Sequence, residues 1–210
     1  MHSETLPVVL TERLRIEHVR AGQAGKHAEF FARNRAHLRR WEPPRPEGFE
    51  TPAYWQRQLV RGEEHFAAGR AAAFALFLRD ESDGPLVGRV NFSQIFRGPF
   101  HSCMLGYQID SAHEGRGLMT EAIAACIDFA FGALRLHRIQ ANYMPENERS
   151  ARLLARLGFE REGYAKDYLF IDGAWRDHVL TARLNRAFDT AVLEKPAPHA
   201  AAANPGDATR

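Results

Sequence analysis

Cysteine is scarce in this sequence, with only Cys103 and Cys126 among 210 residues. Two cysteines are too few for a disulfide scaffold, and they lack the paired spacing of a zinc or redox site. We therefore expect a reduced, cytoplasmic protein. Cys126 falls on the apolar side of a predicted helix, and a buried thiol usually acts as a small hydrophobic side chain. Both residues are therefore expected in the core rather than as reactive nucleophiles.

Long hydrophobic runs and a strong charge of either sign are also missing. No apolar run approaches the ~20 residues that cross a bilayer, and the first residues carry no secretion signal, so no membrane partner is expected. The 28 Lys and Arg nearly balance the 26 Asp and Glu, and this balance gives no argument for nucleic-acid binding. The ten histidines show no metal-binding spacing, so we predict no metal.

The composition that remains is that of an ordinary globular domain. Hydrophobic residues make up 45% of the chain, enough for one buried core. Residues 187–210 are rich in Ala and Pro and are predicted to be a disordered tail. The remainder, residues 1–186, is predicted to be a single domain.

The order of periodic segments indicates an α/β (α+β) domain with a mixed sheet, antiparallel at its start and end. Strands are predicted at 11–19, 71–80, 85–96, 103–110, 138–144, 161–172 and 174–184. Helices are predicted at 22–41, 52–69, 118–131 and 148–157.

Two glycines, Gly115 and Gly117, stand where the strand at 103–110 gives way to the helix at 118–131. Free N–H groups and the helix dipole attract anions there, and glycine lets a phosphate approach the backbone. A third glycine or a following G-K-[ST] is missing, so the segment fits neither a Rossmann fingerprint nor a P-loop. It predicts a diphosphate site of another kind.

This window, AHEGRG at 112–117, resembles the cofactor loop of the Gcn5-related N-acetyltransferases, although Ala112 replaces the usual Gln or Arg. MPENERSARLLARLGFEREG resembles the second signature of that family, with Asn147 and Ser150 at its marked positions. The resemblance implies about seven strands with splayed central strands, about four helices, and acetyl-CoA as co-substrate. The residues that it assigns to acetyl-CoA are Tyr107, Gln108, Ile109, Glu114, Gly115, Arg116, Gly117, Leu118, Met119, Thr120, Asn147 and Ser150.

Several longer segments are similar to a subgroup, the ribosomal-protein alanine N-acetyltransferases of bacteria. They include NRAHLRRWEP, GRGLMTEA and RSARLLARLGFEREGYAKDYLFIDGAWRDHVL. The likeness implies acetyl transfer to the N-terminal amine of a ribosomal protein by direct attack in a ternary complex. The acceptor walls are expected at Trp41, Glu42, Tyr164 and Tyr168, beside a hairpin turning at Asp172-Gly173. A monomer and a homodimer both remain open.

The resemblance offers Ser150 as the acid that protonates the departing thiolate, while Asn147 and Ser150 also suit the start of a helix. The base is harder to assign. Met104 stands where many relatives have a glutamate, and Leu169 stands at a second such position. Asp167 lies two residues before Leu169, so strand periodicity puts it on the same face, and it is our first choice.

Glu42 and His178 are the other candidate bases, since a carboxylate or a near-neutral histidine suits proton removal. Two further functions stay open at this stage: acetylation of a small amine, such as an antibiotic or polyamine, and non-catalytic binding of acetyl-CoA or the ribosome. A basic cluster late in the first predicted helix can be interpreted as a solvated helix face or as a contact with the ribosome. Its members are Arg33, Arg35, Arg39 and Arg40.

Overall fold

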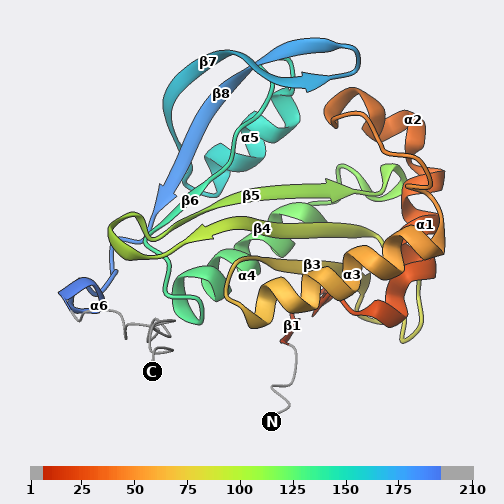
Figure 1. The fold of residues 1–210 in the computed structure, drawn as a ribbon, viewed down its shortest axis with the longest axis horizontal. Coiled ribbons are helices and arrows are strands. Elements are labelled where there is room, and N and C mark those ends of the chain that lie inside the picture. The colour runs from red at the N-terminus through yellow and green to blue at the C-terminus, as the bar shows by residue number, and fades with distance from the viewer. Residues whose placement is uncertain (1–6, 195–210) are drawn as a thin grey trace, which may run out of the picture.

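An eight-stranded sheet forms the centre of the protein (Figure 1). The computed structural model describes residues 7–194. The strand order is β1-β2-β3-β4-β5-β6-β8-β7, in which only β5 and β6 are parallel neighbours among the described strands. The predicted mixed α/β architecture is therefore confirmed. The strands are β1 Val8–Leu10, β2 Leu14–His18, β3 Ala72–Leu78, β4 Gly88–Phe96, β5 Ser102–Ile109, β6 Arg138–Gln140, β7 Glu160–Ile171 and β8 Ala174–Leu184.

Helices cover both faces of this sheet (Figure 1). Helices α1 and α3 pack on one face through one apolar cluster, and α4 packs on the other through a second cluster. The helices are α1 Ala24–Arg33, α2 Arg35–Leu38, α3 Pro52–Ala67, α4 Leu118–Gly132, α5 Glu148–Arg156 and α6 Ala191–Glu194. Short 3-10 turns lie at η1 Ala21–Gln23, η2 Arg39–Trp41, η3 Gly98–Phe100 and η4 Ser111–His113.

Strand β3 shows why the sequences of the central strands are continuously apolar. Its Phe74 and Leu76 join the cluster under α4, whereas Ala75 and Phe77 join the cluster under α1 and α3. Both faces of the strand are thus removed from water, and the usual alternation of polar and apolar residues disappears.

The predicted single helix over 22–41 is wrong, because the chain breaks at Asn34. The Asn34 Nδ2 donates to the Phe30 carbonyl at 2.9 Å, and its Oδ1 accepts from the Ser111 N–H at 2.9 Å. A buried asparagine that bonds a distant loop competes with the helical ladder and ends α1. The chain then turns through α2 and η2 toward the carboxyl end of β5.

Two strands also differ from their predicted bounds. The short edge strand β1, paired with β2, was not predicted, so the described sheet has eight strands rather than seven. Strand β6 ends at Gln140, although a strand was predicted to Met144. Beyond it the chain follows β8, through a hydrogen bond from Ala141 to Thr181 and a bridge between Tyr143 and Val179.

The end of the pairing between β5 and β6 opens the sheet beside β5. Pairing between β5 and β6 covers only Ser102 to Met104, while β5 continues to Ile109. From Leu105 onward β5 pairs only with β4 among the described strands. The predicted splay of the central strands is confirmed, and it leaves one edge of the β5 backbone available to a ligand.

The C-terminal end of the described chain still touches the domain. The Phe188 ring lies 5.3 Å from the ring of His101 and 5.2 Å from that of His137. Residues 195–210 lie outside the described part, so the domain boundary after Arg186 and the disordered tail stay predictions. None of the described helices is long and apolar enough to cross a membrane.

Candidate active site

A cavity of about 1070 Å³ follows the open edge of β5, between the start of α4, helix α5 and the α2–η2 segment. Nearly all residues predicted to bind the co-substrate line this cavity, and so do Trp41 and Glu42. Arg116 is the exception. The predicted residues that line the cavity are Tyr107, Gln108, Ile109, Glu114, Gly115, Gly117, Leu118, Met119, Thr120, Asn147 and Ser150.

The glycines at the start of α4 adopt the left-handed conformation. Gly115 has φ +73° and Gly117, the N-cap of α4, has φ +76°, a region that other L-residues rarely enter. No side chain caps this helix end, and a Cβ at Gly115 would meet nothing within 4 Å. The uncapped N–H groups and the open space together suit an anion such as a diphosphate.

Residues in the turn between β1 and β2 hold this loop, although no local sequence pattern indicates the contact. The Arg13 Nη1 donates to the Arg116 carbonyl at 2.8 Å, and the Arg13 N–H donates to Glu121 at 2.8 Å. Thr11 donates to the same carboxylate at 2.6 Å. Partial burial opposes the change, but these bonds lower the pKa of Glu121. The partners lie more than 100 residues apart, which explains why local patterns miss them.

Ser150 and Tyr107 meet at the other side of the cavity. The Asn147 Oδ1 accepts from the Ser150 N–H at 3.1 Å, so Asn147 is the predicted N-cap of α5. Burial raises the pKa of Tyr107 to about 12, opposed by a hydrogen bond with the Ser150 side chain. The phenol is therefore neutral near pH 7. The Ser150 hydroxyl interacts with this phenol and lines the cavity.

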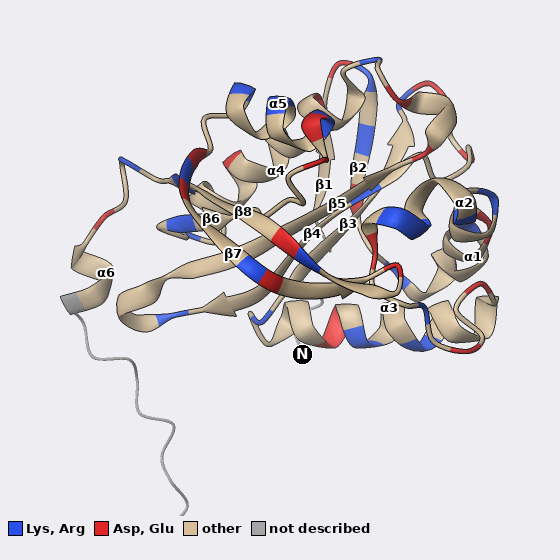
Figure 2. Cartoon of the chain, turned by 90° about the horizontal axis from the view of Figure 1, so that it is seen from above, with Lys and Arg blue, Asp and Glu red and all other residues tan. Residues whose placement is uncertain are grey.

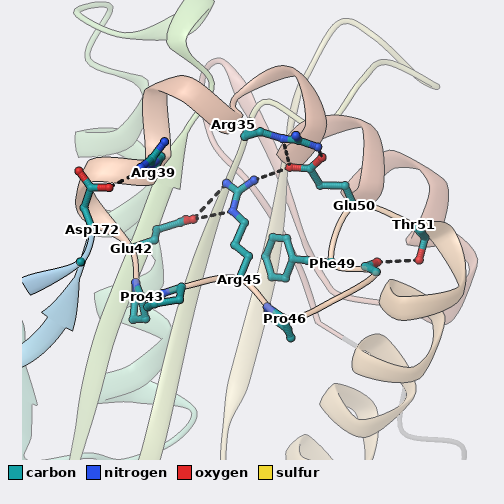
Figure 3. A pocket seen from close by; sticks show the side chains of 13 residues that line it. Arg35, Arg39, Glu42, Pro43, Arg45, Pro46, Phe49, Glu50, Thr51 and Asp172 are labelled. Atoms are coloured by element: carbon teal, nitrogen blue, oxygen red, sulfur yellow. Dashed lines mark hydrogen bonds and ion pairs between the residues drawn. The ribbon is translucent and has the colours of Figure 1, made fainter.

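A second cavity, of about 590 Å³, adjoins the first, and Figure 3 shows the side chains that line it. Its walls are the proline-rich loop that follows Trp41 and the turn between β7 and β8 at Asp172 and Gly173. Both turn residues have positive φ, as the predicted two-residue hairpin requires. Glu42 lines both cavities and so stands where they meet.

Glu42 is largely covered and held from one side. Arg45 donates to its Oε2 from Nε and Nη2, at 3.3 and 3.1 Å (Figure 3). The Oε1 of Glu42 and the Oε1 of Gln108 are buried without a hydrogen-bond partner among the described residues. A turn of the Gln108 amide lets its NH2 donate to Glu42. Burial raises the pKa of Glu42, while Arg45, Arg89 and Gln108 oppose the increase.

Asp167 occupies a different place from the one that strand periodicity predicted. A register shift between Ala165 and Leu169 breaks the alternation of side chains, and Asp167 itself has φ +48°. The residue is exposed and lines neither cavity. Its proposed role as base remains a prediction, with no supporting contact among the described side chains.

Tyr164, Tyr168 and His178 also line neither cavity. The Tyr164 hydroxyl donates to Asp177 at 2.6 Å, and the Tyr168 hydroxyl accepts from Asn142 at 3.0 Å. His178 is buried beside Tyr168, with ring centres 5.0 Å apart. These residues shape the β7–β8 hairpin, and only the turn of that hairpin reaches the second cavity.

Both cysteines lie in the core, as predicted. Burial raises the pKa of Cys103 and of Cys126 to about 12, so neither supplies a thiolate near neutral pH. Within residues 7–194 no group of three His, Cys, Asp or Glu side chains could hold a metal ion.

The basic cluster around α2 is largely ion-paired. Arg33 contacts Asp110 at 2.5 Å, Arg35 pairs with Glu50, and Arg39 contacts Asp172 at 2.9 Å. In Figure 2 acidic and basic positions are interspersed over the elements. The cluster therefore does not form a uniform basic surface.

The split beside β5, the glycine loop at α4 and the Asn147–Ser150 helix start define a Gcn5-related acetyltransferase. The family model described as "Acetyltransferase (GNAT) domain" matches residues 13–160, and the chain belongs to this family.

Similar proteins agree on the family. The "[Ribosomal protein uS5]-alanine N-acetyltransferase" of Escherichia coli K12 is 50% identical over 172 residues, which cover 82% of this chain and 88% of the relative. The structure of the ribosomal-protein-S5-alanine acetyltransferase from Vibrio fischeri has a TM-score of 0.83 at 40% identity, over 87% of this chain and 99% of that one. Mycobacterium smegmatis RimJ, in complex with CoA-disulfide, has a TM-score of 0.76 at 31% identity, over 86% of each chain.

Proposed function

We propose that this acetyltransferase uses acetyl-CoA to acetylate the α-amine of an N-terminal alanine, carried by a ribosomal protein in the cytoplasm. Two of the relatives above are named for this reaction on ribosomal protein uS5 or S5. The observation that carries the proposal is the position of Glu42, which lines both the large cavity and the second, adjoining cavity.

The larger cavity fits acetyl-CoA by its donors and its size. The unpaired edge of β5 at Tyr107–Ile109 offers backbone groups to an amide-bearing pantetheine arm. The uncapped N–H groups of Leu118–Thr120 face the space that a diphosphate would fill. Bound there, acetyl-CoA supplies the activated acetyl thioester, and the chain supplies orientation and proton transfer.

Glu42 is the base that this geometry favours. One carboxylate oxygen is held by Arg45, and the other has no hydrogen-bond partner among the described residues. Glu42 lines the second cavity, so an acceptor ammonium entering from there would meet its carboxylate and lose a proton to it. The raised pKa of Glu42 brings it closer to that of an α-amine, which favours proton transfer near neutral pH.

Ser150 is the proposed acid, with Tyr107 beside it. The hydroxyl lines the cavity close to the phenol of Tyr107, which stays protonated near pH 7 because burial raises its pKa to about 12. A protonated phenol can donate to Ser150 while Ser150 donates to the departing sulfur. Acid and base then act from opposite walls of one cavity, as direct acetyl transfer in a ternary complex requires.

A peptide acceptor suits the second cavity better than a compact polyamine. The cavity has apolar walls from Pro43, Pro46 and Phe49, and the acidic side chains that line it are all ion-paired. A polyamine would favour unpaired carboxylates, which this cavity lacks among the described residues. Trp41 lines the large cavity next to Glu42, where it would restrict the size of the first side chain.

The test is acetyl transfer to a panel of amines. It compares an alanine-initial peptide, the same peptide with a blocked α-amine, serine-initial and phenylalanine-initial peptides, an aminoglycoside and spermidine. We expect alanine to be the best acceptor, serine weaker, and the others poor. A blocked peptide or small amine as the best acceptor would overturn the N-terminal assignment. Absence of thioester turnover with every amine would favour a non-catalytic module.

A further inference from the structure

The charges around the second cavity are sorted by depth. The side chains of Arg35 and Arg39 are 70% and 77% exposed, whereas those of Glu42 and Glu50 are 13% and 16% exposed. Arg45 is also deep, at 16% exposed, and Asp172 is 34% exposed beside Arg39. The rim therefore carries two basic side chains and one acidic one, and the floor two acidic side chains and one basic one.

The two rim arginines keep unused hydrogen-bond donors. Arg39 donates from Nε to Asp172 at 2.9 Å, and Arg35 donates from Nε and Nη2 to Glu50 (Figure 3). A guanidinium has five N–H donors. The remaining donors of Arg35 and Arg39 have no acceptor among the described residues, so each can still bind a carboxylate.

The width of the second cavity indicates which residue of a peptide acceptor would carry such a carboxylate. A compact cavity of about 590 Å³ is roughly 8–10 Å across, and an extended chain advances ~3.4 Å per residue. With its α-amine at Glu42, an acceptor would therefore place its third or fourth residue at the rim.

We propose that the second cavity selects acceptors with an acidic side chain at the third or fourth residue, recognised by Arg39 with Arg35 beside it. The inference rests on the proposed function and specifies its substrate class. The acidic floor orients the N-terminal ammonium, and the basic rim binds the downstream carboxylate. The Arg39–Asp172 pair joins η2 to the β7–β8 turn at this rim, and the incoming carboxylate competes with Asp172 for Arg39.

The test uses two sets of peptides that begin with alanine and carry Glu, Gln or Lys, in one set at the third and in the other at the fourth residue. For exposed charge pairs we expect kcat/KM to fall about three- to tenfold from Glu to Lys in at least one set, mostly through KM, with less discrimination at high salt. Equal use of all peptides overturns this inference and leaves the proposed function intact. No turnover of any of them overturns both.

Three variants separate recognition from a structural role of the ion pair. Arg39→Gln should remove most of the Glu preference. Asp172→Asn should keep or increase it, because the competing carboxylate is gone. Arg61→Gln, an exposed α3 position that lines neither cavity, is the control and should change nothing. If Arg39→Gln and Asp172→Asn lower all peptides equally, the pair is only a structural link and the inference is wrong.

Discussion

Glu42 shows how a single residue acquires a function from its neighbours. Burial raises the pKa of the Glu42 carboxyl group, and Arg45 limits this increase by donating to one carboxylate oxygen. Arg45 is itself fixed by Glu50 at 2.8 Å and by the Phe31 carbonyl at 3.0 Å. The carboxylate is therefore oriented by a chain of alternating charges that begins at exposed Arg35.

Replacing Glu42 by Gln should lower kcat by ~10²-fold or more, since general base catalysis commonly contributes that much. The isosteric amide keeps the shape of the site, so acetyl-CoA affinity should change little. Steady-state kinetics and calorimetry measure the two effects. Glu47→Gln, an exposed position in the same loop, serves as the control. A larger loss for Asp167→Asn than for Glu42→Gln would restore Asp167 as the base.

Ser150 and Tyr107 should behave as one catalytic unit. Ser150→Ala and Tyr107→Phe are each expected to lower kcat more than they raise the KM for acetyl-CoA, because the interaction strengthens in the transition state. Their double variant should be no worse than about the more impaired single variant, since coupled residues are not additive. Fully additive losses would show that the phenol does not act through Ser150.

At the scale of elements, the loop before α4 depends on backbone conformation rather than on side chains. Gly115 and Gly117 take positive φ values, and Arg13 holds the loop through the Arg116 carbonyl. Helix α4 then lies on the sheet through an apolar face. The helical spacing of apolar residues predicts most of that face, namely Leu118, Ala122, Ile123, Cys126, Ile127 and Ala130, which are buried, and Phe131, which is only partly buried. The pattern misses Met119, which is buried in the same core.

Gly117→Val should abolish acetyl-CoA binding, because the side chain enters the space next to the helix end. It should also lower the thermal midpoint, since a β-branched residue at φ +76° costs ~1–3 kcal/mol of strain. Calorimetric titration and thermal unfolding measure both. Gly132→Ala, near the end of the same helix, is the matched control, as its Cβ meets nothing within 4 Å. Unchanged affinity in Gly117→Val would place the co-substrate elsewhere.

The sequence was sufficient for elements defined by local patterns and insufficient where distant contacts decide. The hairpin turn at Asp172 and the N-cap at Asn147 follow from residues within a few positions. The break at Asn34 depends on Ser111, which is 77 residues away. The bulge that exposes Asp167 includes the bond from its N–H to Asp177, and no periodicity reveals such a bond.

The same difference between local patterns and distant contacts explains why one half of the site is easier to predict than the other. The co-substrate half lies on consecutive segments, β5 through α4 and the start of α5, so motifs reveal it. The acceptor half joins Glu42 and Arg45 to the β7–β8 turn, more than 120 residues later in the chain. Sequence reasoning named Glu42 as a candidate and missed Arg45, because only the folded chain brings their partners together.

For the whole molecule, buried neutral histidines should make the fold sensitive to acid. Burial lowers the pKa of His27 from 6.5 to about 3 and also lowers that of His18. Between these values the unfolded chain binds the proton first, so the free energy of unfolding falls as pH falls. The slope is ~1.4 kcal/mol per pH unit for each such histidine.

Urea unfolding of His27→Gln should be measured at several values between about pH 7 and about pH 4. The free energy of unfolding should depend less steeply on pH than in the parent protein, by roughly the contribution of one histidine. An unchanged slope in His27→Gln would mean that His27 is protonated in the fold.

The central claim, acetylation of a ribosomal protein at its N-terminal alanine, is tested most directly by mapping the product on an intact acceptor. The measurement is mass spectrometry of ribosomal protein uS5, prepared with an unmodified N-terminal alanine and incubated with acetyl-CoA and this protein. We predict one acetyl group, located on the α-amine, and a strong loss of that signal with Glu42→Gln. Acetyl groups on lysine side chains with an unmodified N-terminus would contradict the claim.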